Sequence, residues 1–128
     1  MAECCGGHGN AKTVLIYGCS GGANVGEVAD RAARRLMAEG LGTMWCLAGL
    51  GAGVEPILAK ARQADVNLVL DGCDVDCARK VFERAGIANV VQVRATDVGI
   101  EKTKGAAATD EQVARLVEKA REVLAERT

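Results

Sequence analysis

The 128-residue chain carries 16 basic and 17 acidic residues, a net charge of −1 at pH 7 with its single histidine neutral. This balance leaves no basic surface for a phosphate backbone, so nucleic-acid binding is not expected. No apolar stretch approaches the ~20 residues of a membrane-spanning helix, and residues 1–12 lack the hydrophobic segment of a signal peptide. We therefore expect a single-domain cytoplasmic protein that does not enter membranes.

Aromatic residues make up only 2% of the chain, whereas hydrophobic residues as a whole make up 49%. The core must therefore consist of Val, Leu, Ile and Ala, as in buried parallel sheets. The six cysteines also need an explanation. Disulfides are rare in the cytoplasm, so metal binding or thiol chemistry is the better expectation.

The first half of the chain begins with a polar, Gly-rich segment over residues 1–12, which we expect to be a flexible tail. Residues 13–17 are short, continuous and apolar, which predicts a buried strand. A Gly-rich turn follows over residues 18–26. Asn24 and Glu27 have the spacing of a capping box, which predicts a helix that ends near Gly40.

The next elements repeat this alternation. Residues 43–47 predict a second strand and residues 50–53 a Gly-rich loop. A helix is expected over residues 54–63, with a proline that the first helical turn tolerates. Residues 66–70 predict a third strand.

The last part of the chain begins with a turn over residues 71–75, in which Asp74 is expected to cap a helix that ends at Gly86. Residues 90–93 predict a fourth strand. The final helix opens with a capping box over residues 109–112 and continues with an apolar stripe.

Strands and helices thus alternate along the chain, which predicts an α/β domain over residues 13–128. We expect three layers, with a four-stranded parallel sheet between helices on both faces. The architecture would be Rossmann-like or flavodoxin-like, and by analogy we predict the strand order 2-1-3-4.

Three cysteines recur with the period of this fold. Cys19, Cys46 and Cys73 are separated by 27 residues twice in succession, and each lies at or just beyond the end of a predicted strand. One strand–helix unit separates them, so the fold returns them to the same edge of the sheet. Neighbouring strands lie about 4.8 Å apart, which would let the three sulfurs approach one another.

A fourth cysteine, Cys77, follows Cys73 by one helical turn and returns to the same side. Four thiolates are the usual shell of a closed tetrahedral zinc site. We therefore expect zinc to be bound by Cys19, Cys46, Cys73 and Cys77. The alternative is that these residues are buried and act as small hydrophobic side chains.

The same location also permits thiol chemistry, because ligands bind at the carboxyl ends of parallel strands and helix N-termini there stabilise anions. Cys73 would be the nucleophile of a redox or sulfur-transfer enzyme, with Cys77 or Cys19 as the resolving cysteine. Because thiolates are soft ligands, copper(I) or arsenite could occupy the same site in place of zinc.

Four sequence blocks resemble the DGC-domain family, which is named for an Asp-Gly-Cys motif. They are Cys19-Ser-Gly-Gly-Ala-Asn-Val-Gly26, Met44-Trp-Cys-Leu-Ala-Gly-Leu-Gly51, Asp71-Gly-Cys-Asp-Val-Asp-Cys-Ala78 and Thr96-Asp-Val-Gly-Ile100. The resemblance covers about residues 13–124. It implies a zinc-binding protein whose ligands are Cys19, Cys46, Cys73 and Cys77, and it implies no particular activity.

One departure from the family concerns the residues before the Thr96 block. A histidine often lies there in the family, whereas this chain has Val93, Arg94 and Ala95. Any chemistry that depends on such a histidine is not expected here.

Several other residues are candidates for binding. The glycines of residues 19–26 could cradle a small anion. Phosphatase chemistry is rejected, because the loop has Val25 where an arginine is required. Asp71 is expected either to shape its loop or to orient a metal ligand. Thr96 and Asp97 are expected in a turn or along the crevice, where a protein partner could also bind.

The N-terminal segment holds its own small cluster, Cys4, Cys5 and His8. We expect it to belong to the flexible tail, and its alternative role is to deliver metal to the main site.

Overall fold

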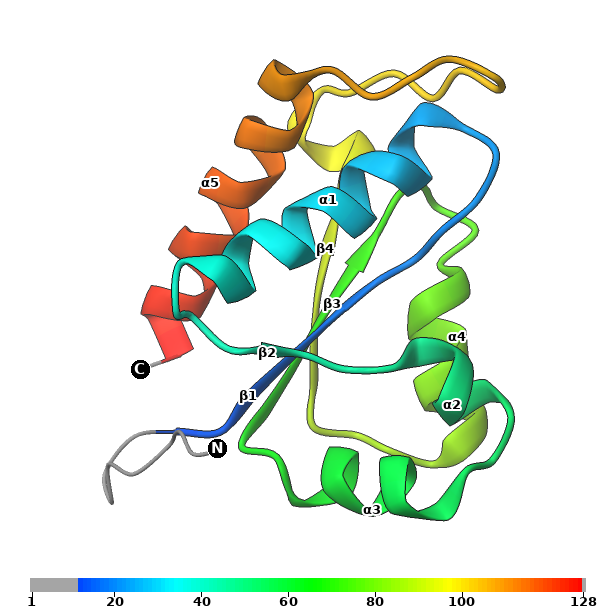
Figure 1. Cartoon of the computed structure of the whole chain (residues 1–128), viewed down its shortest axis with the longest axis vertical. Helices are drawn as coiled ribbons and strands as arrows, with labels where there is room; N and C mark the ends of the chain where they lie inside the picture. Colours follow the sequence, from blue (N-terminus) through cyan, green and yellow to red (C-terminus); the bar gives the residue numbers. More distant parts are fainter. Residues whose placement is uncertain (1–11, 128) are drawn as a thin grey trace.

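The computed structural model describes residues 12–127. Its centre is a parallel sheet of four strands in the order β2-β1-β3-β4 (Figure 1), which confirms the predicted fold and strand order. The strands are β1 (Val14–Gly18), β2 (Thr43–Met44), β3 (Val66–Asp71) and β4 (Val90–Arg94). The expected tail over residues 1–12 and the Cys4, Cys5 and His8 cluster lie outside the described residues, except for Lys12.

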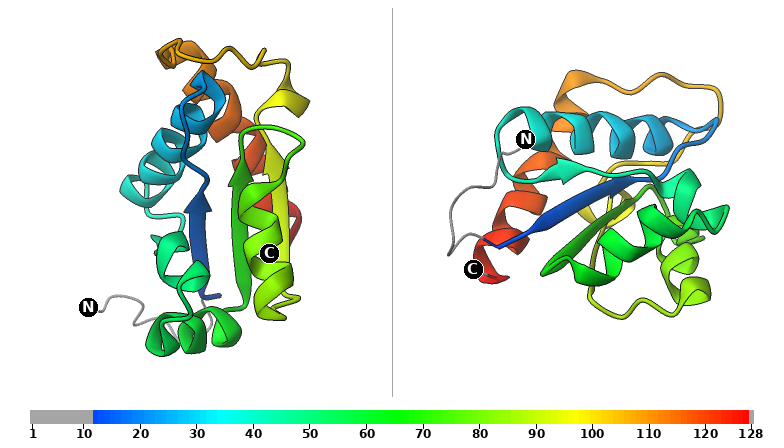
Figure 2. Two further views of the ribbon diagram at one scale, coloured as in Figure 1. Left: turned by 90° about the vertical axis from the view of Figure 1, so that its right-hand side faces the viewer. Right: turned by 60° about the horizontal axis from the view of Figure 1, so that its bottom comes forward.

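The helices connect the strands and cover both faces of the sheet (Figure 2). They are α1 (Asn24–Ala38), α2 (Leu47–Gly51), α3 (Glu55–Gln63), α4 (Cys77–Ala85), the short 3₁₀ helix η2 (Thr96–Val98) and α5 (Asp110–Arg127). No helix among the described residues is long and apolar enough to cross a membrane.

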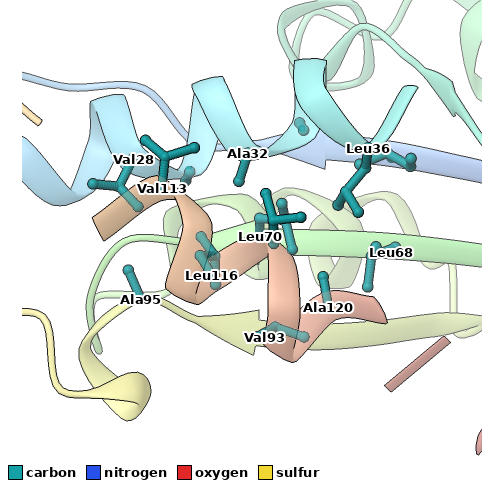
Figure 3. Packing of buried hydrophobic residues seen from close by; sticks show 14 of the residues in the cluster. Val28, Ala32, Leu36, Leu68, Leu70, Val93, Ala95, Val113, Leu116 and Ala120 are labelled. Atoms are coloured by element: carbon teal, nitrogen blue, oxygen red, sulfur yellow. The ribbon is translucent and has the colours of Figure 1, made fainter. Parts of the chain in front are cut away.

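One face of the sheet is covered by α1 and α5, which lie side by side (Figure 1). Their apolar stripes meet the inward side chains of β3 and β4 (Figure 3). Leu36, Leu68 and Leu116 are fully buried there, and each buried leucine contributes about 1.5–3 kcal/mol relative to an exposed one. This layer holds the N-terminus of α1 against the carboxyl ends of the strands.

The other face is covered by α2, α3 and α4 and contains two of the three aromatic residues in its buried core. The rings of Tyr17 and Phe82 make an edge-to-face contact with centroids 4.7 Å apart. The Tyr17 hydroxyl donates to Oδ1 of the buried Asn67 at 2.7 Å, and Asn67 Nδ2 donates to the carbonyl of Ala61 at 2.9 Å. Burial raises the pKa of Tyr17 above its ordinary value. The buried polar atoms thus have partners, as burial requires.

The second strand is shorter than predicted, and helix α2 (Leu47–Gly51) takes the last residue of the predicted strand and the first half of the predicted loop over residues 50–53. The sheet bonds end where Trp45 N–H donates to the carbonyl of Ile16 at 2.8 Å. Cys46 is then the N-cap of α2, because its Sγ accepts the Gly49 N–H at 3.2 Å. A cysteine sulfur takes the role of the capping oxygen, which explains why the sequence pattern gave no helix start there.

Two of the three caps predicted at helix N-termini are wrong. The Asn24 side chain does not cap α1 but bonds a distant segment, as described below. Asp74 is exposed, and α4 begins only at Cys77. The third prediction is confirmed: Thr109 N–H donates to Gln112 Oε1 and Gln112 N–H donates to Thr109 Oγ1, each at 3.1 Å.

A candidate thiol site at the carboxyl edge of the sheet

The four cysteines of the described residues are free thiols at one edge of the sheet. Cys19, Cys46 and Cys73 follow the carboxyl ends of β1, β2 and β3, and Cys77 is the first residue of α4. The backbone continues the sheet here, since Cys19 N–H donates to the carbonyl of Leu70 at 2.9 Å. Cys46 and Cys77 are exposed, whereas Cys19 and Cys73 are half-buried.

Cys19 lies deepest in this group. Its Sγ accepts the Gly72 N–H at 3.1 Å. The pKa of the Cys19 thiol is raised from 9.0 to about 11, chiefly by burial; the Gly72 N–H opposes this rise, and the charges of Asp71, Cys77 and Cys73 contribute to it. Cys19 is therefore a neutral thiol near pH 7, with two other thiols close enough to act on it.

Cys73 lies beside a cation that the sequence analysis did not select. Lys102 Nζ is 3.4 Å from Cys73 Sγ. The segment over residues 101–105 lies against the Gly-rich turn before α1 (Figure 1) and is tied to it by Asn24, whose Nδ2 donates to the Glu101 carbonyl at 2.8 Å and whose Oδ1 accepts the Thr103 N–H at 2.7 Å. The buried Asn24 thus holds the segment that carries Lys102 beside the thiols at the carboxyl edge of the sheet.

Cys46 lies beside β2 at this edge. Among the described residues, the cysteines whose charges act on Cys19 are Cys73 and Cys77. Cys46 instead lines an open groove of about 840 Å³ together with Met37, Met44 and Trp45. The four thiols therefore share the carboxyl edge of the sheet, with Cys46 beside β2.

Asp71 has the loop-shaping role that was one of its two expected roles. It is 1% exposed, and its carboxylate accepts the N–H groups of Ala78 at 2.8 Å and Arg79 at 3.2 Å. Gln92 Nε2 donates to the same carboxylate at 2.8 Å. Asp71 is thus the side chain that satisfies the first turn of α4, in place of Asp74.

A second carboxylate, Asp76, precedes Cys77 and is bound from β4. Arg94 contacts it with Nε at 2.6 Å and a second guanidinium nitrogen at 2.8 Å. The hydrogen bonds of Arg94 lower the pKa of Asp76 to about 2, against the effect of burial, and Gln92 adds to the lowering. Arg94 also reaches Asp97 at 3.4 Å, so that Asp97, in the short helix with Thr96, takes part in this charged turn.

Part of the expected anion cradle over residues 19–26 is bonded within the protein itself. Asn24 N–H donates to the Thr103 carbonyl at 3.1 Å, and Gly26 N–H donates to the Ala23 carbonyl at 3.1 Å. The Gly22 carbonyl accepts the Gly105 N–H at 3.0 Å. Two N–H groups that an anion would need are therefore already used.

No group of three or more His, Cys, Asp or Glu side chains within residues 12–127 is arranged to hold a metal ion. The thiols share an edge of the sheet and an electrostatic environment, but the sulfur atoms do not form a coordination sphere as they stand.

The model of one known family, the DGC domain, matches residues 15–120. The chain belongs to the DGC-domain family. It is also 33% identical over 91 residues to the anaerobic and virulence modulator AnvM of Pseudomonas aeruginosa, a match that covers 71% of this chain and 70% of AnvM. No solved structure matches the chain.

Proposed function

We propose that this DGC-domain protein binds zinc through the thiolates of Cys19, Cys46, Cys73 and Cys77. The observation that carries the proposal is the placement of four free thiols at the carboxyl edge of the sheet, where Cys19, Cys46 and Cys73 follow three neighbouring strands and Cys77 begins α4. Thiolates are soft ligands, which bind zinc in preference to hard cations such as magnesium or calcium.

The high pKa of Cys19 has a direct consequence for metal binding. A thiol with a pKa of about 11 must lose its proton to become a ligand, so binding should release protons. Burial is the main reason that Cys19 keeps its proton, and a divalent cation would offset both the cost of burying the thiolate and the nearby charges of Asp71, Cys73 and Cys77. Because the sulfur atoms do not form a coordination sphere as they stand, binding also requires the exposed Cys77 and Cys46 side chains to turn towards Cys19.

The surroundings of the sulfurs supply donors for thiolates. Gly72 N–H donates to Cys19 and Gly49 N–H donates to Cys46. Lys102 adds a positive charge beside Cys73. Hydrogen bonds and charges of this kind orient thiolate ligands and stabilise them on a metal.

Elemental analysis of protein purified without oxygen tests the proposal. We expect one zinc ion per chain in the wild type and loss of that zinc in Cys73→Ser and Cys19→Ser. Ser20→Ala, in the same turn but without a sulfur, is the matched control and should keep the zinc. Fully folded wild-type protein that contains no metal would contradict the proposal.

A thiol redox function is the second candidate, and the Lys102–Cys73 contact is the observation that favours it. The Cys73 thiolate would attack a small-molecule disulfide and release one thiol. Cys77 or Cys19 would then displace the second thiol and close a protein disulfide, so that two electrons and two protons pass to the substrate.

Equilibration with oxidised and reduced glutathione separates the two functions. A protein with the thiol redox function should form a reversible disulfide from Cys73 to Cys77 or Cys19, which peptide mapping would identify. The metal-binding protein should show thiols that zinc protects from oxidation. Binding of a small anion or a protein partner at the same edge, and a cytoplasmic location, stay predictions.

A further inference from the structure

The residue before Cys77 has a backbone conformation that side chains rarely adopt. Within residues 12–127, Asp76 is the non-glycine residue with positive φ, at φ 59° and ψ 43°. This left-handed conformation is unfavourable for residues with a Cβ, although Asp tolerates it better than most. Such a residue persists only where its surroundings hold it, and strain of this kind gathers at functional sites.

The restraint on Asp76 comes from β4, a strand on the far side of β3 from Cys19. Arg94 grips both carboxylate oxygens of Asp76, at 2.6 and 2.8 Å. Gln92, two residues earlier on the same strand, donates Nε2 to Oδ1 of Asp76 at 2.7 Å. The paired contact of a guanidinium with a carboxylate fixes direction as well as distance.

The residues after Cys77 are held by the second carboxylate. Asp71 accepts the N–H groups of Ala78 and Arg79, and Gln92 Nε2 bridges Asp71 and Asp76 at 2.8 and 2.7 Å. Cys77 therefore lies between two anchored neighbours, with a strained residue on one side and a capped helical turn on the other. We call Asp71, Asp76, Gln92 and Arg94 the carboxylate brace.

We propose that Asp76 and Arg94 are positioning residues that set the place of Cys77 relative to Cys19 and Cys73. Within residues 12–127, the side-chain hydrogen bonds of Asp76 and Arg94 join them to each other, to Gln92 and to Asp97, so both residues act through the backbone of the turn that ends at Cys77. The expected effect of Asp76 and Arg94 on metal binding rests on the proposed zinc site. Their expected effect on the backbone of the turn does not depend on it.

A purely stabilising ion pair explains these observations less well. The side chains of Arg94 and Asp76 are 27% and 16% exposed, and a partly exposed pair on an ordinary turn contributes little stability. Here the pair instead supports an unfavourable backbone conformation one residue before a thiol. Removing it should change the turn locally and leave the rest of the fold intact.

Hydrogen exchange on the metal-free protein tests the backbone part. Arg94→Gln should speed exchange of the Ala78, Arg79 and Lys80 amides by roughly tenfold or more, because their acceptors lie on Asp71 and on Asp76. Amides of β1 and α5 should be unchanged. Arg84→Gln, which removes an equal charge from the exposed last turn of α4, should have no effect. Unchanged exchange in Arg94→Gln would overturn the proposal.

Arg94→Lys decides the result if Arg94→Gln loosens the whole chain. Lysine keeps the charge but cannot grip both oxygens, so it should reproduce the local loss at Ala78 and Arg79. If the Ala78 and Arg79 amides of Arg94→Lys exchange at the wild-type rate, charge alone matters and the paired contact does not position the turn.

Cobalt(II) titration tests the effect on the thiols, because its absorption depends on how many thiolates bind it. Arg94→Gln should give the spectrum of Cys77→Ser, and the double variant should add nothing further. A wild-type spectrum in Arg94→Gln would overturn the positioning role. If the wild type takes up no cobalt, the proposed metal site fails, and the exchange result alone decides whether the brace holds Cys77.

Discussion

At the scale of single residues, buried Asp71 shows how one side chain can serve both the fold and the site. Its carboxylate satisfies two N–H groups of α4 and one side-chain amide of β4. The same negative charge raises the pKa of Cys19. The Asp of the Asp-Gly-Cys motif therefore fixes the helix that carries Cys77 and influences the thiol opposite it.

Replacement of Asp71 tests this structural role. Asp71→Ala should destabilise the protein by about 2–3 kcal/mol, since a helix start and a buried amide lose their acceptor together. Urea unfolding measures the change. Asp74→Ala, at an exposed position of the same loop, should stay within about 0.5 kcal/mol of the wild type. Equal effects of the two substitutions would show that Asp71 does not cap α4.

At the scale of elements, the apolar runs and the helix periodicity sufficed to predict the parallel sheet with helices on both faces, because right-handed crossovers leave few arrangements. The strand order 2-1-3-4 was predicted only by analogy with flavodoxin-like sheets. The apolar runs and the helix periodicity did not suffice for α2, whose cap is a cysteine sulfur. They also did not identify Lys102, Asp76 and Arg94 as partners of the site. Those contacts depend on which segments pack together after folding, and no local pattern encodes them.

The packing of α1 on β1 provides an element-scale prediction. A Cβ at Gly18 would lie 2.7 Å from the Ala29 carbonyl oxygen and 2.9 Å from the Asp30 Cα. Gly18→Ala should therefore push the helix from the strand beside Cys19 and cost about 1–3 kcal/mol. Gly21→Ala, which meets nothing within 4 Å, is the matched control. Thermal unfolding that is the same for both variants would contradict the close approach.

At the scale of the whole molecule, an ion pair joins the C-terminal end of α1 to α5. Arg121 Nε lies 3.1 Å from Glu39 Oε1. The hydrogen bond with Arg121 lowers the pKa of Glu39, and Arg35 adds to the lowering. A lowered pKa means that the pair stabilises the fold above the ordinary glutamate pKa and that this contribution disappears as the pH falls through the lowered value.

Arg121→Gln tests this pH dependence. The variant should unfold at a lower temperature than the wild type near pH 7, by a small amount because both side chains are partly exposed. The difference should shrink when the pH is brought well below the ordinary glutamate pKa of ~4.3. If the difference in unfolding temperature grows on acidification, the Arg121–Glu39 ion pair does not stabilise the fold in the way described.

Metal binding should also be visible in the stability of the whole molecule, because a ligand that binds only the folded state stabilises it. A free zinc concentration of about 100 times Kd would add about 2.7 kcal/mol, which raises the Tm of a domain of this size by roughly 5–15 °C. Chelation should remove the increase. In Cys73→Ser zinc and chelator should give the same Tm, whereas Ser20→Ala should behave as the wild type. If zinc raises the Tm of Cys73→Ser as much as that of the wild type, the ion binds somewhere other than this edge of the sheet.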